Sequence, residues 1–396
     1  MSIVPKITSR VLSFLYQHWR NQPPMCESVK DWSKTQSPTI AELLYEQRLS
    51  SQSVDVPMPT VVGETTHDRL WEKFSRRSRY TLSERYLVSI AEAKLVGEIG
   101  AVILPDGAYT IETAWRKEQL MRLPEYYSVL KKWRLKPVKK AGNYFSLLQL
   151  YCNGNNYYHW MHDVLSKLFV VIDLLPEDVT YIVPPQLKDW QYEALEMVGI
   201  RREQTLVFEP KEQWQLEKLY FAPLVSSNAG HSLSAIEWLR DSAYQRFGID
   251  SQESRTERIF ISRSRAVGRT IVNQDEVEAL LDRYGFKSYC LEEMSIEQQV
   301  SLFSKAEIVI APHGAGLTNL MFAPSGTKVL EIFEPSAGGV CFWSLCHCLN
   351  HPYQCLFGKT VPNPKFAAQP NILVSIETLA SALPAFVGEP IPTVSS

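Results

Sequence analysis

The stretch IVIAPHGAGLTNLMFAPSGTKVLEIF, residues 308–333, contains two apolar runs joined by a loop with two glycines. The runs Ile308–Ile310 and Lys328–Phe333 are rich in β-forming residues, so each is predicted to be a buried strand. Between them, residues 311–319 lead from the first strand into a predicted helix. Ligands of parallel α/β sheets bind beyond the carboxyl ends of the strands, where the chain turns into helix. The stretch therefore predicts an α/β sheet with a ligand-binding loop.

Strands and helices alternate on the amino-terminal side of this stretch as well. The alternation occurs twice, first between Tyr144 and Tyr220 and again from Arg258 onwards. The predicted strands cover 145–152, 179–183, 259–261 and 287–290, and the predicted helices cover 159–175, 190–198, 274–284 and 295–305. Such alternation implies parallel sheets covered on both faces. Because the two blocks are separated near 226–254, we expect two doubly wound Rossmann-like domains with a cleft between them.

The remaining segments have other patterns. Residues 1–84 are polar and contain prolines, which predicts an N-terminal extension of helices and loops. From Tyr86 to Trp115, β-forming residues alternate around the turn Pro105-Asp106-Gly107, which predicts an antiparallel meander. We place the two Rossmann-like domains at 85–228 and 229–360. Residues 361–396 form a C-terminal tail that either packs across the other domain or stays loose.

Composition limits the classes of function. The 396 residues include 41 basic and 43 acidic side chains, a net charge of -2, so no global field attracts nucleic acid. Seven cysteines, an odd number in a long chain, favour a reducing compartment over a disulfide framework. No apolar run has transmembrane length and no signal peptide is evident, so we expect a cytoplasmic protein. The basic amphipathic stretch 6–20 either rests on the inner face of a membrane as a peripheral contact or packs on the protein.

The loop 311–319 has the composition of a phosphate site. Gly314 and Gly316 allow backbone amides to approach a ligand, and the following helix N-terminus favours anions. His313 is a further hydrogen-bond donor. The other residues of the loop that we expect to contact a ligand are Ala315, Leu317, Thr318 and Asn319. The alternative is a tight turn without a ligand, but this combination directly after a buried strand favours binding.

Three arginines follow the predicted strand 259–261. Arg263, Arg265 and Arg269 lie within seven residues, and guanidinium groups bind phosphate bidentately. In a nearly neutral chain, this cluster predicts a diphosphate clamp, with Arg263 and Arg269 favoured by their position. The alternative is a solvated basic turn.

A third group combines two histidines with a carboxylate. His159 and Asp163 are four residues apart, so they share one face of the predicted helix, and His162 is a neighbour. A carboxylate bonded to an imidazole is a workable general base. A metal site and a purely structural role are the alternatives. The cluster Cys341, Cys346, His347, Cys348, His351 and Cys355 lacks the paired spacing of a zinc site, so we interpret its cysteines as core residues.

The segments NYYHWMHDVLSKL (156–168), ISRSRAVGRTIVN (261–273) and the stretch 297–333 occur in an order that resembles glycosyltransferase family 61. The likeness extends over about 85–360. It implies a GT-B architecture of two facing Rossmann-like domains, the first for the acceptor and the second for the nucleotide sugar. It also implies inverting transfer from a nucleoside-diphosphate sugar to a hydroxyl of a glycan or lipid-linked glycan, with no obligatory metal or other cofactor. Without a recognisable anchor, the chain is more similar to the bacterial members, which are linked to capsule or exopolysaccharide synthesis.

Within that expectation, each group of candidate residues has an expected role in the transfer. No Asp-x-Asp pair is present to hold a metal on the diphosphate, so the leaving group is met by the arginines and by the loop after His313. Asp163, His159 or His162 takes the proton of the acceptor hydroxyl, and the sequence does not choose among them. Glu331 is a candidate for the ribose hydroxyls. The competing hypothesis is a non-catalytic glycan- or nucleotide-binding scaffold of a polysaccharide assembly complex. Donor sugar, base, linkage and oligomeric state are not readable from the sequence.

Overall fold

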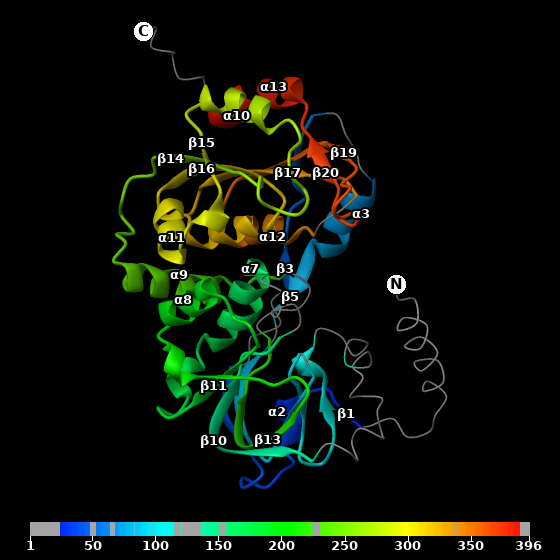
Figure 1. Cartoon of the computed structure of the whole chain (residues 1–396), viewed down its shortest axis with the longest axis vertical. Coiled ribbons are helices and arrows are strands. Elements are labelled where there is room, and N and C mark those ends of the chain that lie inside the picture. Colours follow the sequence, from blue (N-terminus) through cyan, green and yellow to red (C-terminus); the bar gives the residue numbers. More distant parts are fainter. Residues whose placement is uncertain are drawn as a thin grey trace. The chain divides into compact units, whose positions relative to one another are not determined.

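The computed structural model describes residues 24–47, 53–63, 68–82, 84–97, 99–114, 120, 136–149, 156–224, 230–336 and 339–388. Contacts divide the chain into two compact units, 1–50 with 83–225 and 51–82 with 226–396. Each unit has its own sheet (Figure 1). The predicted α/β fold class is confirmed, and two such sheets are consistent with a GT-B-like arrangement.

The first unit contains a mixed sheet. Its strand order is β1 (Met25–Cys26), β9 (Tyr109–Thr110), β8 (Ala101–Ile103), β7 (Lys94–Val96), β13 (Gln213–Phe221), β10 (Val138–Ser146), β11 (Thr180–Val183) and β12 (Thr205–Val207). Strands β6 (Arg85–Ala91) and β2 (Ala41–Gln47) extend from β13. The four strands from β13 to β12 are parallel. Of the predicted antiparallel meander, β7, β8 and β9 pair in succession, while β6 pairs with β13 and β2 instead of β7. The core beneath this sheet includes Phe208, Trp214 and Leu216.

The helical part of the first unit is less regular than predicted. Helix α8 (Asp189–Met197) and the short α2 (Val29–Ser33) are ordinary α-helices. The predicted helix 159–175 instead consists of α7 (Tyr157–His159), a π-helical turn (Trp160–Val164) and 3₁₀ turns at Leu165–Leu168 and Ile172–Leu174. The predicted strand 145–152 ends at Ser146, and residues 150–155 lie outside the described residues. Buried aromatic and histidine side chains crowd this segment, which disfavours a regular 3.6-residue repeat.

The second unit is built on a parallel sheet in the order β15 (Lys287–Tyr289), β14 (Glu257–Ile261), β16 (Ala306–Pro312), β17 (Lys328–Phe333), β18 (Tyr353–Phe357) and β4 (Thr60–Val62). Helices α10 (Gln274–Asp282) and α13 (Ile376–Val387) cover one face, and α11 (Ile296–Ser304) and α12 (Cys341–Cys348) lie on the other (Figure 1). Helix α9 (Leu233–Phe247) precedes β14 in the chain. Because both faces are covered, Ile308, Val309 and Ile310 are fully buried, which explains their continuous apolar run.

Numbered along the chain from β14 to β18, five strands of this sheet lie in the order 2-1-3-4-5. This doubly wound order reverses between its first and third strands, β14 and β16. Doubly wound proteins bind ligands at that switch point, beyond the carboxyl ends of the strands. The segment that follows β14 contains the arginines, and the segment that follows β16 contains His313 and the glycines. The strand order therefore brings the two predicted phosphate-binding segments to one edge of the sheet.

Both ends of the chain differ from the sequence-based expectation. Residues 1–84 do not form one extension, because β1 and β2 join the first sheet while β4 joins the second. Helix α3 (Asp68–Arg77) also packs in the second unit, where Leu70 and Phe74 are fully buried. The fold also contains two small antiparallel sheets of two strands each. One pairs β3 (Ser53–Asp55) with β5 (Arg79–Thr81), and the other pairs β19 (Lys359–Val361) with β20 (Asn371–Leu373).

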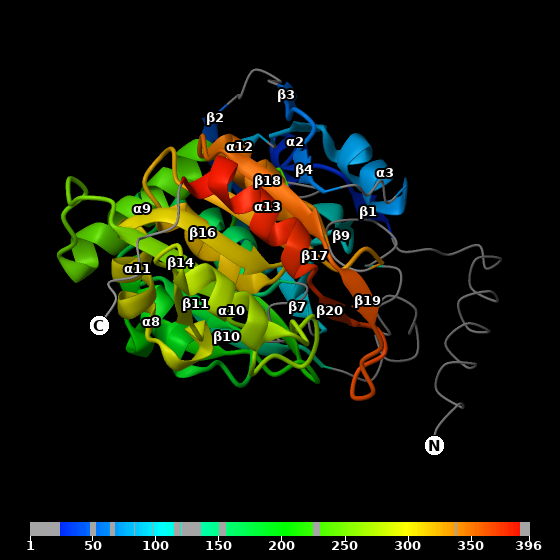
Figure 2. The same cartoon turned by 90° about the horizontal axis from the view of Figure 1, so that it is seen from above.

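The described part of the C-terminal tail packs on the second unit. Leu379, Leu383 and Phe386 of α13 lie four and three residues apart on one helical face and are buried in the same core as β16 and β17. Figure 2 looks down on α13, with the β19–β20 pair at its edge. No helix within the described ranges is long and apolar enough to cross a membrane. The predicted amphipathic stretch 6–20 lies outside the described residues.

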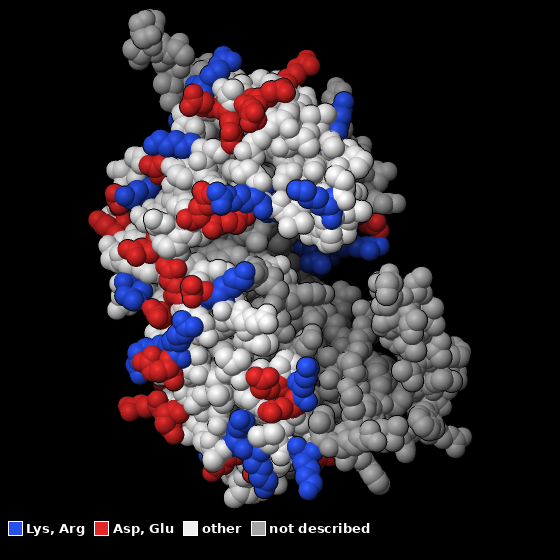
Figure 3. Space-filling view, in the orientation of Figure 1, with Lys and Arg blue, Asp and Glu red and all other residues white. Residues whose placement is uncertain are grey.

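The charged side chains fit the near-neutral composition. On the face drawn in Figure 3, Lys and Arg side chains alternate with Asp and Glu side chains over the coloured surface.

Candidate functional site

Two arginines lie at the switch point of the second sheet. We call residues 262–273, which follow β14, the arginine loop. Within it, Arg263 donates from Nη2 to the carbonyl oxygen of Gly268 at 3.0 Å. The Nε atoms of Arg263 and Arg269 are buried and have no hydrogen-bond acceptor within the part of the chain that the structure describes. Burial, reinforced by the charge of Arg269, lowers the pKa of Arg263 to about 10.

Arg269 has a lowered side-chain pKa and an uncommon backbone conformation. Burial lowers the pKa of its guanidinium, while the nearby carboxylate of Glu331 acts in the opposite direction. Its backbone has a φ of +57°, a left-handed conformation that side chains other than glycine rarely adopt. Two close, desolvated cations with unfilled donors are unfavourable by themselves. An anion between them would supply both the missing acceptors and the compensating charge.

Gly314 makes room for the first of these arginines. A Cβ atom at this position would lie 2.0 Å from Nη1 and 2.8 Å from Cζ of Arg263. The φ of Gly314 is 177°, an extended conformation that any residue adopts, so its glycine is needed for space and not for backbone freedom. Gly316 is also tightly enclosed, since its Cβ would meet Leu291 at 3.0 Å and Ile261 at 3.3 Å. The loop after β16 thus passes directly against the Arg263 guanidinium.

The helix that follows is a 3₁₀ helix over Ala315–Phe322, and most of its side chains face inward. Leu317 is fully buried in the core. Asn319 donates from Nδ2 to Gln299 Oε1 at 2.8 Å and to Gly316 O at 3.2 Å, so it fixes the loop on α11. Thr318 is fully buried, and its hydroxyl has no partner among the described residues. Of the polar side chains predicted here to contact a ligand, Asn319 therefore has a scaffold role in this structure.

Both ring nitrogens of His313 form hydrogen bonds within the protein. Gly339 N donates to its Nε2 at 3.3 Å, so Nδ1 carries the proton and donates to Glu331 Oε1 at 2.5 Å. The ring also stacks on Phe333, with centroids 5.2 Å apart. In this arrangement His313 shapes the loop, and a hydrogen bond from it to a ligand would require the contact with Gly339 to open.

Glu331 does not present its carboxylate to a ribose. Its side chain is fully buried, with one oxygen bonded to His313 and the other accepting from Tyr353 Oη at 2.6 Å. Glu331 therefore fixes the tautomer and orientation of His313. Sequence reasoning missed Tyr353 and Gly339 as partners, because neither lies in a motif and both reach the site only through the fold.

Arg265 differs from the other two arginines. It is largely exposed and forms an ion pair with Glu293, also at the surface. Such a pair contributes little to stability and leaves the side chain in water. The two arginines that the sequence favours by position, Arg263 and Arg269, are the ones whose Nε atoms are buried.

The histidine–carboxylate group lies in the first unit. Asn156 caps the segment by accepting from the backbone N–H of His159, and His159 Nδ1 lies 2.6 Å from Asp163 Oδ2. Burial raises the pKa of Asp163, while the hydrogen bond and charge of His159, together with the charge of Lys167, oppose the rise. His162 is buried and packs against Tyr158, with ring centroids 4.7 Å apart. π-Helical turns such as the one containing Asp163 occur frequently at functional sites.

The cysteine cluster is not a metal site in this structure. No group of three or more His, Cys, Asp or Glu side chains within the described ranges could hold a metal ion. The six cysteines that the structure describes carry free thiols, and Cys346 and Cys355 are buried in the core. Burial raises the pKa of the Cys341 thiol to about 12, so it remains neutral.

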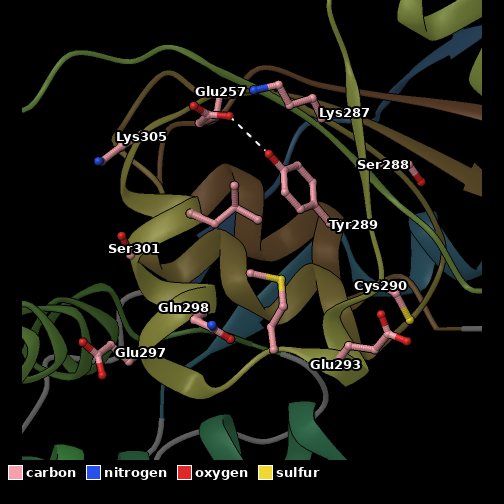
Figure 4. Close-up of a pocket in the computed structure, with 12 residues that line it drawn as sticks. Glu257, Lys287, Ser288, Tyr289, Cys290, Glu293, Glu297, Gln298, Ser301 and Lys305 are labelled. Carbon is pink, nitrogen blue, oxygen red and sulfur yellow. Dashed lines mark hydrogen bonds between the residues drawn. The ribbon is translucent and has the colours of Figure 1, made fainter.

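A separate groove of about 780 Å³ runs between the edge strand β15 and helix α11. Figure 4 shows Tyr289 in the groove, pointing to Glu257, with charged and polar groups of both signs around it. Glu293 connects the groove to Arg265, but neither buried arginine lines it. We therefore assign the candidate anion site to the switch point and not to this groove.

A doubly wound sheet with partly buried arginines at its switch point has the arrangement by which α/β proteins hold anionic ligands. Comparison with known proteins narrows this class. Residues 157–330 match the family model described as Glycosyltransferase 61. The match includes the His159–Asp163 pair, the arginine loop and the loop after β16, and the resemblance seen in the sequence is thereby confirmed.

Two curated relatives align with parts of the chain. A β-1,2-xylosyltransferase of Oryza sativa subsp. japonica is 23% identical over 205 residues, which cover 46% of this chain and 44% of the rice protein. The EGF domain-specific O-linked N-acetylglucosamine transferase of Drosophila melanogaster is 32% identical over 69 residues, which cover 17% of this chain and 13% of the fly protein. The chain thus spans less than half the length of either relative.

Proposed function

We propose that this protein transfers a sugar from a nucleoside-diphosphate donor to a hydroxyl of a glycan or lipid-linked glycan acceptor. The transfer inverts the anomeric carbon and requires no metal. The observation that carries the proposal is a pair of partly buried arginines, Arg263 and Arg269, whose buried Nε donors have no acceptor among the residues that the structure describes. A diphosphate supplies the oxygens and the negative charge that this pair lacks.

The arginines act on the leaving group. In the proposed reaction the acceptor oxygen forms a bond to the anomeric carbon while the bond from that carbon to the diphosphate oxygen breaks. Negative charge grows on the departing nucleoside diphosphate, where the two guanidinium groups stabilise it. Backbone N–H groups at the start of the helix after Gly314 add partial positive charge. These groups perform the electrostatic task that a divalent cation has in metal-dependent transferases.

The proton of the acceptor hydroxyl goes to the His159–Asp163 pair. The hydrogen bond between Nδ1 and Oδ2 orients the imidazole and balances its charge when a proton arrives. Burial raises the pKa of Asp163, which makes its carboxylate a stronger base than an exposed aspartate. His162 packs against Tyr158 and is the weaker candidate of the three. The first unit accordingly serves the acceptor and the second serves the donor.

The relatives' names suggest the class of the donor sugar. One matched relative is named for xylose transfer and the other for N-acetylglucosamine transfer. We propose a related donor for this chain, with an acceptor in capsule or exopolysaccharide synthesis at the cytoplasmic face of a membrane. Comparing the polysaccharide of cells with and without the intact protein tests that role.

The direct test is a thermal-shift titration of the full chain with uridine, guanosine, cytidine and thymidine diphosphates, each in EDTA and in magnesium. A ligand that binds only the folded state raises the melting temperature. We expect one nucleotide to produce a shift that persists in EDTA. Arg263→Ala should abolish the shift, while Arg283→Ala, which removes an exposed arginine of the same unit, should retain it. Absence of any shift would favour a non-catalytic scaffold, and a shift seen only with magnesium would refute the metal-independent site.

A further inference from the structure

The second half of the arginine loop, residues 267–273, is bound by a segment from the C-terminal part of the chain. We call residues 359–374 the C-terminal strap. It contains β19 and β20, and it lies outside the stretch 157–330 that matches the family. Its β19–β20 pair lies at the edge of the α13 face in Figure 2.

Contacts between the strap and the loop proceed in register. Asn363 donates from Nδ2 to Val267 O at 2.8 Å, and the backbone N–H of Arg269 donates to Pro370 O at 3.2 Å. The side-chain oxygen of Asn371 accepts from the N–H of Thr270 at 3.3 Å and from its hydroxyl at 2.9 Å. A short parallel bridge then joins Ile271 to Ile372, and both side chains are buried in the core.

Two further features show that the strap determines the shape of the loop. A Cβ atom on Gly268 would lie 2.5 Å from the Gln369 carbonyl oxygen and 3.0 Å from Asn363 Nδ2. The loop and the strap are therefore in van der Waals contact at Gly268. Arg269, the next residue, has the left-handed φ of +57°. An L-residue in this conformation is destabilised by about 1–2 kcal/mol and persists only where its surroundings enforce it. The strap contacts on each side of Arg269 provide that enforcement.

We propose that Asn363 and Asn371 of the strap are positioning residues for the anion site, because they hold Arg263 and Arg269 in the geometry that receives the diphosphate. Arg263 is included because its Nη2 bonds to Gly268 O, and Gly268 is pressed against the strap. The inference rests on the proposed function for the identity of the ligand. On this proposal the strap restrains the loop and keeps the two partly buried guanidinium groups at the switch point.

The test compares Asn363→Ala and Asn371→Ala with a matched control. Thr327→Val removes a buried hydroxyl that makes two hydrogen bonds of 2.8 Å at the amino end of β17, the opposite end of the sheet. We expect all three variants to melt at a lower temperature than wild type. Affinity for the nucleoside diphosphate, and for inorganic pyrophosphate as a minimal probe, should fall about 10-fold in the two strap variants only. Equal affinity in the strap variants and the control would reduce the strap to a structural role and overturn the proposal.

A second measurement separates this inference from the proposed function. Phenylglyoxal labelling of the ligand-free proteins, mapped by mass spectrometry, reports how freely each arginine moves into solvent. We expect Arg269 and Arg263 to react faster in the strap variants and at the wild-type rate in Thr327→Val. If wild type binds neither probe but the labelling follows this pattern, the proposed ligand is wrong and the strap assignment stands. Unchanged labelling of both arginines would refute the strap assignment whatever the protein binds.

Discussion

Replacing Gly314 with alanine tests the anion site with the smallest possible change. The new Cβ would lie 2.0 Å from Arg263 Nη1, against an ordinary contact distance of at least 3.4 Å, so the guanidinium must move by about 1.4 Å. The backbone is extended at this position and tolerates alanine. Because the displaced atoms are the end of a long side chain, we expect the free energy of unfolding to change by about 1 kcal/mol or less.

Binding should change far more than stability. A hydrogen bond to a charged group contributes about 1.5–3 kcal/mol, so a displaced Arg263 corresponds to a loss of about 10- to 100-fold in affinity for the nucleoside diphosphate. Isothermal titration calorimetry at one fixed salt concentration measures this loss. In the Arg263→Ala background, Gly314→Ala should cause no further loss, because the group that it displaces is already absent.

Gly326→Ala is the matched control for this substitution. Its Cβ would also approach an arginine, Nη1 of Arg255 at 3.2 Å, but at the amino end of β17. The φ of Gly326 is +89°, so alanine there should lower the free energy of unfolding by about 1–2 kcal/mol without affecting affinity. The two glycine variants should thus show opposite patterns. A Gly314→Ala protein that binds the nucleotide within about twofold of wild type would refute the assignment of Arg263 to the site.

Three further outcomes follow from other parts of the molecule. Asp163→Ala should stop sugar transfer in a radiolabelled-donor assay but leave the affinity for nucleoside diphosphate intact, and equal loss of both would contradict separate donor and acceptor roles. Burial lowers the pKa of His231 to about 3, below its unfolded value near 6.5, so its contribution to stability is complete above pH 6.5 and is lost as the pH falls towards 3. By pH 5.5 this loss is about 1.4 kcal/mol, and urea denaturation of wild type and His231→Asn at pH 7.5 and 5.5 should show a smaller pH effect in the variant. Tyr353→Phe removes the hydrogen bond to buried Glu331 and should lower the free energy of unfolding by about 1–3 kcal/mol, whereas no measurable change would contradict the bonded geometry.

The strands of the second unit could be predicted because burial on both faces leaves a direct trace in the sequence. Ile308–Ile310 is entirely apolar and four of the six residues in Lys328–Phe333 are apolar. The structure places both in the centre of a parallel sheet. Helix α11 was equally readable, since Ser295 and Gln298 form the capping box that begins it. The segment 157–174 was not, because the break between α, π and 3₁₀ turns depends on packing around Trp160 and His162 and leaves no period in the sequence.

The sequence by itself determined which residue types are available for chemistry and the order in which they occur. The arginines, the glycine loop and the His159–Asp163 spacing were all legible, because each depends on neighbours within one strand, turn or helical face. Only the tertiary structure decided what surrounds them. Asn363 donates a hydrogen bond to Val267, which is 96 residues away in the sequence. The carboxylate of Glu331 is hydrogen-bonded to His313 and Tyr353. Side-chain orientation and burial arise from contacts between segments that are distant in sequence, and no local pattern encodes those contacts.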